Sequence, residues 1–155
     1  MIALIQRVSS ASVRVDNRVV AEIGSGLLAL IGIARDDGAA QGTRLLQRLL
    51  DYRVFPDEAG RMNRSLRDLS AGLLLVPQFT LAADTDSGNR PGFQTAAPPE
   101  LARALYGQLL EAARATHLGP VGSGEFGAHM AVELVNDGPV TFWLEVPAAA
   151  GVPEA

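Results

Sequence analysis

The chain has 155 residues, of which 48% are hydrophobic, and this is typical of one domain with a single core. It contains no cysteine, so disulfide bonds, thiol nucleophiles and cysteine-ligated zinc are excluded. Its net charge is −4, and all 13 basic residues are arginine. This balance argues against a protein that coats nucleic acid with a broad basic surface, whereas arginine suits local, bidentate phosphate contacts.

The sequence predicts neither a membrane span nor an export signal. Its apolar runs are shorter than the roughly 20 residues that a membrane-spanning helix needs. Met1 is followed at once by the alternating pattern of a strand, rather than by a charged segment and an apolar stretch. We therefore expect a soluble protein of the cytoplasm without a membrane partner.

The first half of the chain is expected to contain strands and then a helix. Residues 2–8 and 12–15 form either a strand pair or one bent strand, and residues 18–23 return after a turn. The continuous apolar run of residues 27–33 is typical of a strand that is covered on both faces. Residues 41–52 are expected to form a helix, because their leucines recur on one helical stripe.

The second half is expected to contain a buried strand, a helix and a hairpin. Residues 73–81 begin as a buried strand that becomes polar at its end, and residues 101–110 carry the apolar stripe of a helix that follows two prolines. Residues 130–135 and 140–146 read as two strands joined by a turn. The turn does not require proline, so Gly138-Pro139 is either a rigid turn or a device that presents two carbonyl oxygens in a fixed direction.

This order of elements predicts one compact α/β domain over residues 1–146. Its strands would be mixed or mostly antiparallel, and two helices would pack against them. Residues 147–155 are rich in alanine, proline and glycine, and we expect them to form a flexible tail.

The chain offers few side chains for catalysis. His117 is expected near the end of the second helix, where a cation is favourable, and His129 beside a strand is as suited to packing as to catalysis. The acidic residues of the loops lack the spacing of a zinc site or an EF-hand, so we expect no metal and no cofactor. Thr80 has no neighbouring base in the sequence, so we expect it to form hydrogen bonds rather than to act as a nucleophile.

Two segments resemble the motifs of the D-aminoacyl-tRNA deacylase family. Residues 77–81 are similar to the family's Ser-Gln-Phe-Thr-Leu strand end, and residues 136–141 to its Asn-x-Gly-Pro-Val-Thr turn. The resemblance runs from Met1 to about Val146 and includes further similar stretches, namely Met1–Val8, Gly26–Leu28, Tyr52–Phe55, Arg61–Asn63, Arg90–Phe93 and Phe126–Met130. Pro77 stands where the family has serine and lacks a hydroxyl and an amide hydrogen, so we expect the loss of a supporting contact but not of activity.

The resemblance implies a homodimer that hydrolyses the ester bond of D-aminoacyl-tRNA and rejects L-aminoacyl-tRNA. Its partner would be tRNA rather than DNA, and glycine mischarged on tRNA is a further candidate substrate. The catalytic residues would be Gln78, Phe79 and Thr80, where backbone amides stabilise the oxyanion and the ribose 2′-OH assists. Gly138 and Pro139 of the other subunit, joined by a cis bond, would hold the substrate's amino group and block an L side chain. Other residues would brace this unit or line the pocket: Arg7, Phe93 and Met130.

Two other functions stay open at this point. One is a related tRNA-editing deacylase with a different substrate, and the other is a non-catalytic dimeric RNA-binding module. A deacylation assay with D- and L-tyrosyl-tRNA would separate the three.

Overall fold

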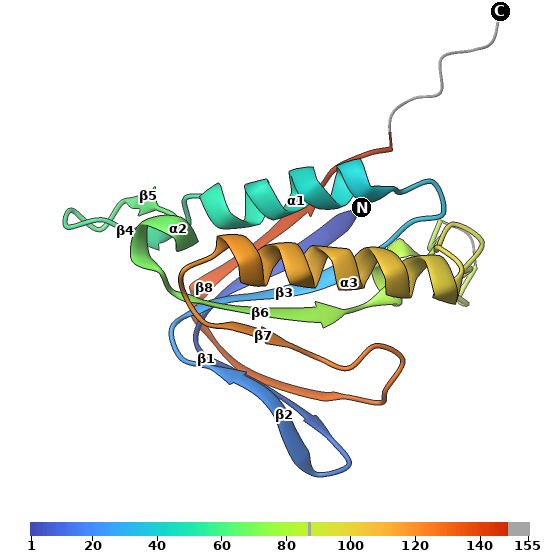
Figure 1. Cartoon of the computed structure of the whole chain (residues 1–155), viewed down its shortest axis with the longest axis horizontal. Helices are drawn as coiled ribbons and strands as arrows, with labels where there is room; N and C mark the ends of the chain where they lie inside the picture. Colours follow the sequence, from blue (N-terminus) through green and yellow to red (C-terminus); the bar gives the residue numbers. More distant parts are fainter. Residues whose placement is uncertain (87, 149–155) are drawn as a thin grey trace, which may run out of the picture.

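The computed structural model describes residues 1–86 and 88–148. Within them, two long helices, α1 (Ala39–Asp51) and α3 (Pro99–Thr116), lie on one face of a six-stranded sheet (Figure 1). The other elements are β1 (Ile2–Val15), β2 (Arg18–Ile23), β3 (Gly26–Gly32), β4 (Phe55–Pro56), β5 (Met62–Arg64), the short helix α2 (Leu66–Leu69), β6 (Gly72–Pro77), the 3-10 helix η1 (Phe79–Ala82), β7 (Val121–Ser123) and β8 (Ala131–Glu145). The predicted α/β fold with two packed helices is confirmed.

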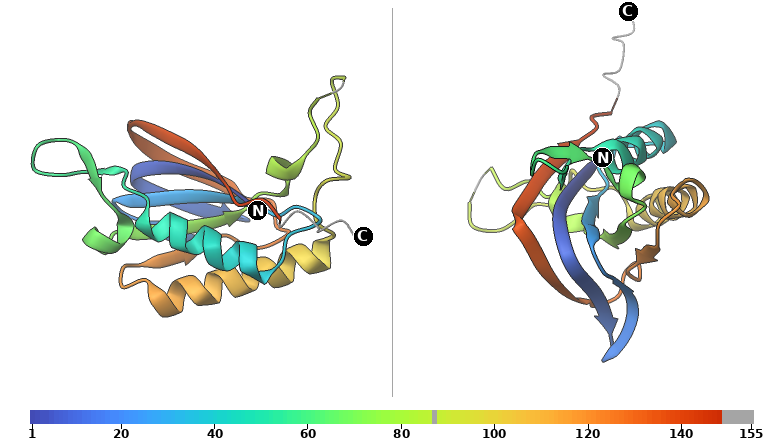
Figure 2. Two further views of the ribbon diagram at one scale, coloured as in Figure 1. Left: turned by 90° about the horizontal axis from the view of Figure 1, so that it is seen from above. Right: turned by 90° about the vertical axis from the view of Figure 1, so that its left-hand side faces the viewer.

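The sheet is mixed and is organised around β1. This long strand pairs antiparallel with β2, β3 and β8, whereas β3, β6 and β7 run parallel to one another. Register shifts beside Val8 and Val13 bend β1, so residues 2–15 form one bent strand rather than a strand pair. The resulting sheet is strongly curved, with both long helices on the same side (Figure 2).

The central strands are buried on both faces, as the apolar run of residues 27–33 predicts. Leu27 and Leu73 pack into the core under the helices, whereas their neighbours Leu28 and Leu74 pack into a second core on the opposite face. Successive side chains of a strand point to opposite faces, so each strand supplies both cores. This arrangement explains why these strands carry hardly any polar residue.

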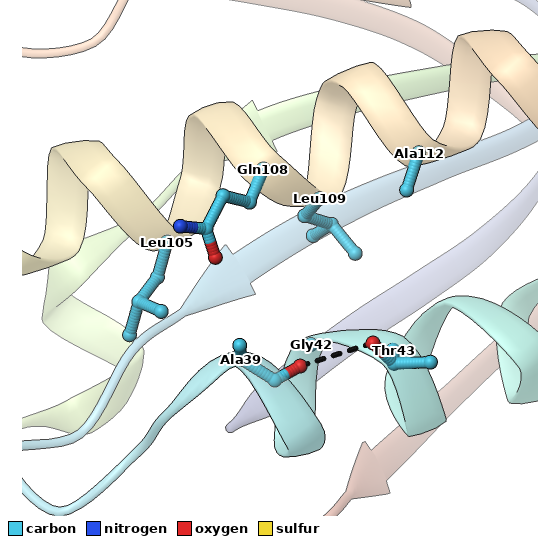
Figure 3. A pocket seen from close by; sticks show the side chains of 7 residues that line it. All are labelled: Ala39, Gly42, Thr43, Leu105, Gln108, Leu109 and Ala112. Atoms are coloured by element: carbon cyan, nitrogen blue, oxygen red, sulfur yellow. Dashed lines mark hydrogen bonds between the residues drawn. The ribbon is translucent and has the colours of Figure 1, made fainter.

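The two long helices pack against each other through small and apolar side chains. Four leucines of α1 are buried, and they are the ones that the helical stripe predicts: Leu45, Leu46, Leu49 and Leu50. A hollow of about 60 Å³ remains between α1 and α3, next to Gly42 and Leu109 (Figure 3). Its size and its position between packed helices mark it as part of the helix interface.

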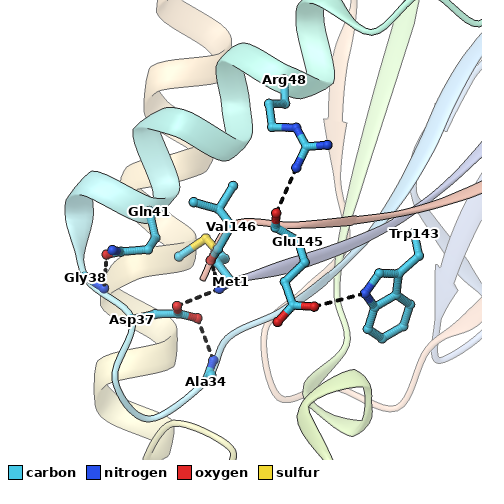
Figure 4. A network of polar contacts seen from close by, with 9 residues as sticks. All are labelled: Met1, Ala34, Asp37, Gly38, Gln41, Arg48, Trp143, Glu145 and Val146. Carbon is cyan, nitrogen blue, oxygen red and sulfur yellow. Dashed lines mark hydrogen bonds and ion pairs between the residues drawn. The ribbon is translucent and has the colours of Figure 1, made fainter. Parts of the chain in front are cut away.

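The amino group of Met1 is buried and forms an ion pair with Asp37 (Figure 4). Met1 N lies 2.6 Å from Asp37 Oδ1 and donates a second hydrogen bond to Val146 O at 2.7 Å. The other carboxylate oxygen, Asp37 Oδ2, accepts a hydrogen bond from Ala34 N at 2.7 Å. Because a buried charge is tolerated only when it is paired, this network fixes the start of β1, the loop before α1 and the end of β8 together.

The predicted hairpin between residues 130 and 146 is wrong. Both halves belong to the single strand β8, and both pair with β1 instead of with each other. Gln6 pairs with Thr141 and Val8 with Asn136, so residues 137–140 bulge out of β8 opposite Arg7. The Gly138-Pro139 unit is therefore the tip of a bulge in an edge strand.

The end of the chain lies partly outside the described residues. Residues 149–155, which make up most of the predicted tail, lie outside them. None of the helices described is long and apolar enough to span a membrane.

Candidate functional site

The end of β6 turns sharply into η1 and leaves two backbone amides without an acceptor. Gln78 N still donates to Ile31 O at 2.7 Å and so completes the pairing of β6 with β3. Phe79 and Thr80 begin η1, where the first amides of a helix have no carbonyl partner, and no acceptor for either amide occurs among the described residues. Such a pair of neighbouring N–H donors can bind an oxyanion.

Close packing holds η1 against the sheet. A Cβ atom at Gly32, the last residue of β3, would lie 2.7 Å from Leu81 Cβ. Glycine is required there because a side chain would push η1 away from β3. The position of the two free amides therefore depends on Gly32 as well as on the motif itself.

Pro77 ends the pairing between β6 and β7. In the parallel register of these strands, Leu73 N donates to Pro120 O and Gly124 N donates to Leu75 O. The next donor on this side of β6 would be the amide of residue 77, directed at Gly124 O. Proline has no such hydrogen, and Gly124 O instead accepts a hydrogen bond from Ser123 Oγ at 2.7 Å.

A cavity of about 440 Å³ opens beside the end of β6. Its wall includes Gln78, Phe79, Met130 and His129, and the rest of its lining is mostly apolar. This volume is in the usual range for a small-molecule site. The cavity therefore brings together three residues that the sequence predicts as site residues, although they come from two distant segments of the chain.

Two exposed aromatic rings lie at the same place. Phe79 is 58% exposed and Phe93 is 43% exposed, and their ring centroids are 5.1 Å apart. The loop that carries Phe93 is closed by a pair of hydrogen bonds between the backbones of Asp84 and Gly92. Exposed rings of this kind can stack on a nucleotide base.

Thr80 faces a different hollow from Phe79. It lies on the wall of a wider depression together with Trp143 and Glu145. Its hydroxyl accepts a hydrogen bond from Gln78 Nε2, and no histidine or carboxylate bonds to it among the described residues. The geometry provides no general base for Thr80, which agrees with a hydrogen-bonding role.

Below the cavity, Tyr106 of α3 joins the helix to the sheet. Its hydroxyl donates to Leu75 O at 2.9 Å and lies 2.7 Å from Ser123 Oγ. Burial raises the pKa of Tyr106 to about 12, so the phenol stays neutral over the physiological range. The network supports the ends of β6 and β7, from which the cavity is built.

A second cluster surrounds the bulge of β8. Arg7 Nε donates to Asp137 O at 3.0 Å and lies 3.3 Å from the Asp137 carboxylate, while Nη1 donates to Val54 O at 2.7 Å. On the other side of the bulge, Val140 N donates to Asn136 Oδ1 at 2.9 Å. The bulge is thus held from both sides, and the Gly138-Pro139 bond within it is cis.

The two clusters lie at opposite ends of the sheet. Pro77 pairs with Ile31 of β3, whereas the bulge lies opposite Arg7, which pairs with Leu27. Four residues along β3 and three strand spacings, at about 3.3 Å and 4.8 Å each, place the clusters about 20 Å apart. One chain therefore does not bring its own Gly138-Pro139 unit to its own cavity.

Comparison with known proteins identifies the family. The profile of the family described as D-Tyr-tRNA(Tyr) deacylase matches residues 4–145. The chain belongs to this family. A protein of Xanthomonas oryzae named D-aminoacyl-tRNA deacylase is 65% identical over 144 residues, which cover 93% of this chain and 99% of that protein. A protein of the same name from Thioalkalivibrio sulfidiphilus is 65% identical over 147 residues, which cover 95% of this chain and 98% of that protein.

Solved structures share the fold. A protein named c-Myc DNA Unwinding Element Binding Protein superposes with a TM-score of 0.91 at 40% identity, over 96% of this chain and 100% of that one. A probable eukaryotic D-amino acid tRNA deacylase superposes with a TM-score of 0.80 at 18% identity, over 94% of this chain and 98% of that one. The family match over residues 4–145 and the relatives at 65% identity confirm the resemblance of the sequence to the deacylase family.

The sequence motifs of this deacylase family member include residues of both clusters. They do not include the residues that hold the clusters in place. The predicted residues fall into two groups. The first lies at the end of β6: Gln78, Phe79 and Met130 line the cavity, Phe93 packs against Phe79, and Thr80 faces the neighbouring depression. The second surrounds the bulge and consists of Arg7, Gly138 and Pro139. The sequence analysis missed Gly32, Asn136 and Tyr106, because each acts through a partner distant in sequence or a local bulge. Of the two histidines, His117 caps α3 and lies 2.7 Å from Ala71 O, whereas His129 is exposed on the cavity wall.

Proposed function

We propose that this protein is a hydrolase that cleaves the ester bond of D-aminoacyl-tRNA and releases the D-amino acid and the tRNA. The observation that carries the proposal is the 65% identity to proteins named D-aminoacyl-tRNA deacylase over 93% or more of the chain. A protein that acts on such substrates would work in the cytoplasm, where tRNA is charged. Glycine mischarged on tRNA has the same ester and no side chain, and it is a second candidate substrate.

The free amides of Phe79 and Thr80 fit the needs of this reaction. Water adds to the ester carbonyl carbon, the carbonyl oxygen becomes negative, and the ribose 3′ oxygen then leaves with a proton. The aminoacyl ester is already reactive, and the neighbouring 2′-OH can assist its hydrolysis. Two N–H groups directed at the oxyanion supply stabilisation without a titrating side chain. Removal of one such donor typically costs about 10² to 10³ in rate.

The cavity beside these amides suits the terminal nucleoside of the tRNA. Its volume of about 440 Å³ and its mostly apolar walls match a base and a sugar better than a phosphate. Phe79 and Phe93 offer exposed rings at its edge, and Met130 lines its wall. In this arrangement the ester lies beside η1, and the amino acid extends away from the cavity.

A homodimer would complete the site. The face of the sheet opposite the helices carries Leu4, which pairs with Leu30 on one side and with Trp143 on the other. Trp143 is 51% exposed, so this face presents an apolar surface that a second copy can cover. The separation of about 20 Å between the two clusters leads to the same proposal, because a Gly138-Pro139 unit can reach a cavity only from the other subunit.

In the proposed dimer the Gly138-Pro139 unit selects the D enantiomer. Backbone carbonyls of this unit would accept hydrogen bonds from the substrate's amino group, and the space that an L side chain needs would be filled. Arg7 holds the unit through Asp137, which is what a rigid steric test requires. Chirality would then be read by backbone atoms rather than by a side-chain pocket.

The test is a deacylation assay with D-tyrosyl-tRNA and L-tyrosyl-tRNA, each with and without EDTA. We expect turnover of the D ester alone, unchanged by the chelator. Equal turnover of both esters would refute chiral selection, and a glycyl-tRNA substrate in the same assay would identify a related editing activity. Tight tRNA binding without turnover of any ester would instead indicate a non-catalytic RNA-binding module.

DNA binding is a second candidate function, which the name of one structural neighbour suggests. The net charge of −4 opposes binding to a duplex through its phosphates. Fluorescence anisotropy with labelled duplex DNA and with tRNA at 100 mM salt compares the two. We expect binding to tRNA only.

A further inference from the structure

Arg103 of α3 stacks on Phe126, an aromatic residue of the cavity wall. Its Cζ atom is 4.7 Å from the centroid of the Phe126 ring, and Phe126 lines the cavity. A Cβ atom built on the neighbouring Gly127 would lie 3.6 Å from Arg103 Nη2, so the guanidinium also borders this backbone turn. A guanidinium stacked on a ring keeps its N–H groups available at its edge.

Arg103 does not belong to the arginines that form ion pairs among the described residues. Arg18 and Arg67 form ion pairs at 3.1 and 2.8 Å with Glu125 and Asp51. In the part of the chain that the structure describes, no carboxylate lies within ion-pair distance of Arg103, although Glu100 is one turn away on α3. Its charge is therefore available to a ligand.

The chemistry of the proposed substrate calls for a cation at this place. A nucleoside in the cavity carries the rest of the tRNA on its 5′ oxygen, so a phosphodiester lies at the mouth of the cavity. The walls are mostly apolar and carry no arginine or lysine. The protein as a whole is acidic, so the favourable field must come from a local group. Arginine binds phosphate through two parallel N–H donors.

We propose that Arg103 binds the phosphodiester on the 5′ side of the terminal nucleotide. It is a positioning residue: it fixes the depth at which the nucleoside sits and does not touch the ester. The inference rests on the proposed function, because it concerns the same cavity and the same substrate. It adds a contact with the RNA backbone that does not depend on the amino acid.

Arg114 provides a matched control. It is an exposed arginine on the same helix, 11 residues further along, which places it about 16 Å from Arg103 along the axis. Arg103→Gln and Arg114→Gln change the net charge equally. Arg114 lies in the last turn of α3, where its charge favours the helix, so the thermal unfolding of both variants is compared as well. Only the first removes a cation from the cavity mouth.

The experiment measures kcat/KM for two substrates over a range of salt concentrations. One is D-tyrosyl-tRNA, and the other is the D-tyrosyl ester of adenosine, which has no phosphate. We expect Arg103→Gln to lower kcat/KM for the tRNA about tenfold at low salt. It should also make the slope of log kcat/KM against log salt shallower by about 0.7, the value for one contact with a single strand. The adenosine ester should be cleaved as by the wild type, and Arg114→Gln should leave both substrates unchanged.

The outcomes separate this inference from the proposed function. Equal effects of the two substitutions on the tRNA would overturn it, as would an equal loss on both substrates, which would mean that Arg103 only supports Phe126. Absence of D-ester cleavage by the wild type would refute the proposed function instead. In that case, anisotropy with an RNA trinucleotide ending in adenosine decides the matter: weaker binding to Arg103→Gln than to Arg114→Gln supports the contact, and equal binding overturns it.

Discussion

The amide of Phe79 is the group whose loss should affect the reaction most. Phe79→Pro removes both the N–H and the aromatic ring, whereas Phe79→Ala removes the ring alone. The comparison of the two variants therefore isolates the amide. Proline fits this position, because it is the first residue of η1, where the missing N–H breaks no hydrogen bond of the fold. Gln78 before it, with φ −140° and ψ 81°, is outside the helical region that a following proline disfavours.

The magnitude follows from the geometry of the two free amides. Loss of one of two oxyanion donors costs about 10² to 10³ in kcat. Phe79→Ala should mainly weaken binding, because stacking of a base on a ring is worth about 1 to 3 kcal/mol. We therefore expect Phe79→Ala to raise KM, and Phe79→Pro to lower kcat by a further factor of about 10² to 10³.

Single-turnover deacylation of D-tyrosyl-tRNA at saturating enzyme measures the difference. Thermal unfolding serves as the control, and both variants should unfold within a few degrees of each other. Equal single-turnover rates for Phe79→Pro and Phe79→Ala would refute oxyanion stabilisation by this amide. A large difference in unfolding temperature would show that proline disturbs η1, and the rate difference would then not measure the amide alone.

Three further changes test other parts of the structure. Gly138→Ala should abolish activity, because its Cβ would lie 2.6 Å from Val140 Cγ2. A purified heterodimer of one Gly138→Ala subunit and one Phe79→Pro subunit should regain about half of the wild-type activity. A site that is formed within one chain predicts no activity in this heterodimer. Asp37→Asn leaves the buried amine of Met1 without its anion and should lower the free energy of unfolding, measured by urea titration, by about 3 kcal/mol. An unchanged urea midpoint would show that the ion pair does not stabilise the fold. The pKa of Tyr106 is raised to about 12 in the folded state, so the neutral phenol stabilises the fold fully below pH 10, and this contribution of about 3 kcal/mol is lost as the pH rises from 10 towards 12. The free energy of unfolding of Tyr106→Phe should therefore fall less over this pH range than that of the wild type. Identical pH profiles of the two proteins would argue against this role of Tyr106.

Local patterns in the sequence predict the helices and the buried strands well. The leucine stripe of residues 41–52 corresponds to α1, which spans Ala39–Asp51, and the apolar run of residues 27–33 corresponds to β3. These features depend on neighbours within one or two turns or on burial of every residue, and both leave a periodic trace.

The hairpin shows where such patterns fail. Residues 136–139 have the composition of a tight turn, but β1 spans 14 residues and offers hydrogen bonds to both halves of β8. Pairing with a long partner that is more than a hundred residues away leaves no local trace, so the turn signal is misread. The contact between Arg7 and Val54 is hidden for the same reason, because it joins β1 to a loop that neither segment's pattern predicts.

The site itself could be predicted from motifs but not from physical patterns. Gln78, Phe79 and Thr80 were expected at a strand end, and the structure adds that the chain bends into η1 there. That bend frees the amides of Phe79 and Thr80 while that of Gln78 stays bonded to Ile31 O. Which amides are free depends on where β6 pairing stops, and this is a property of three strands together.

The buried amine of Met1 has a practical consequence for anyone who produces this protein. A residue added in front of Met1 turns the amine into an amide, removes its charge and leaves Asp37 without a cation in a place with no room for a longer chain. A purification tag belongs at the C-terminal end, because the chain has already left the sheet by Ala148. An N-terminal tag should instead be removed by a protease that leaves Met1 as the first residue. Activity measured on a protein that keeps such an extension would report on a loosened fold as well as on the chemistry.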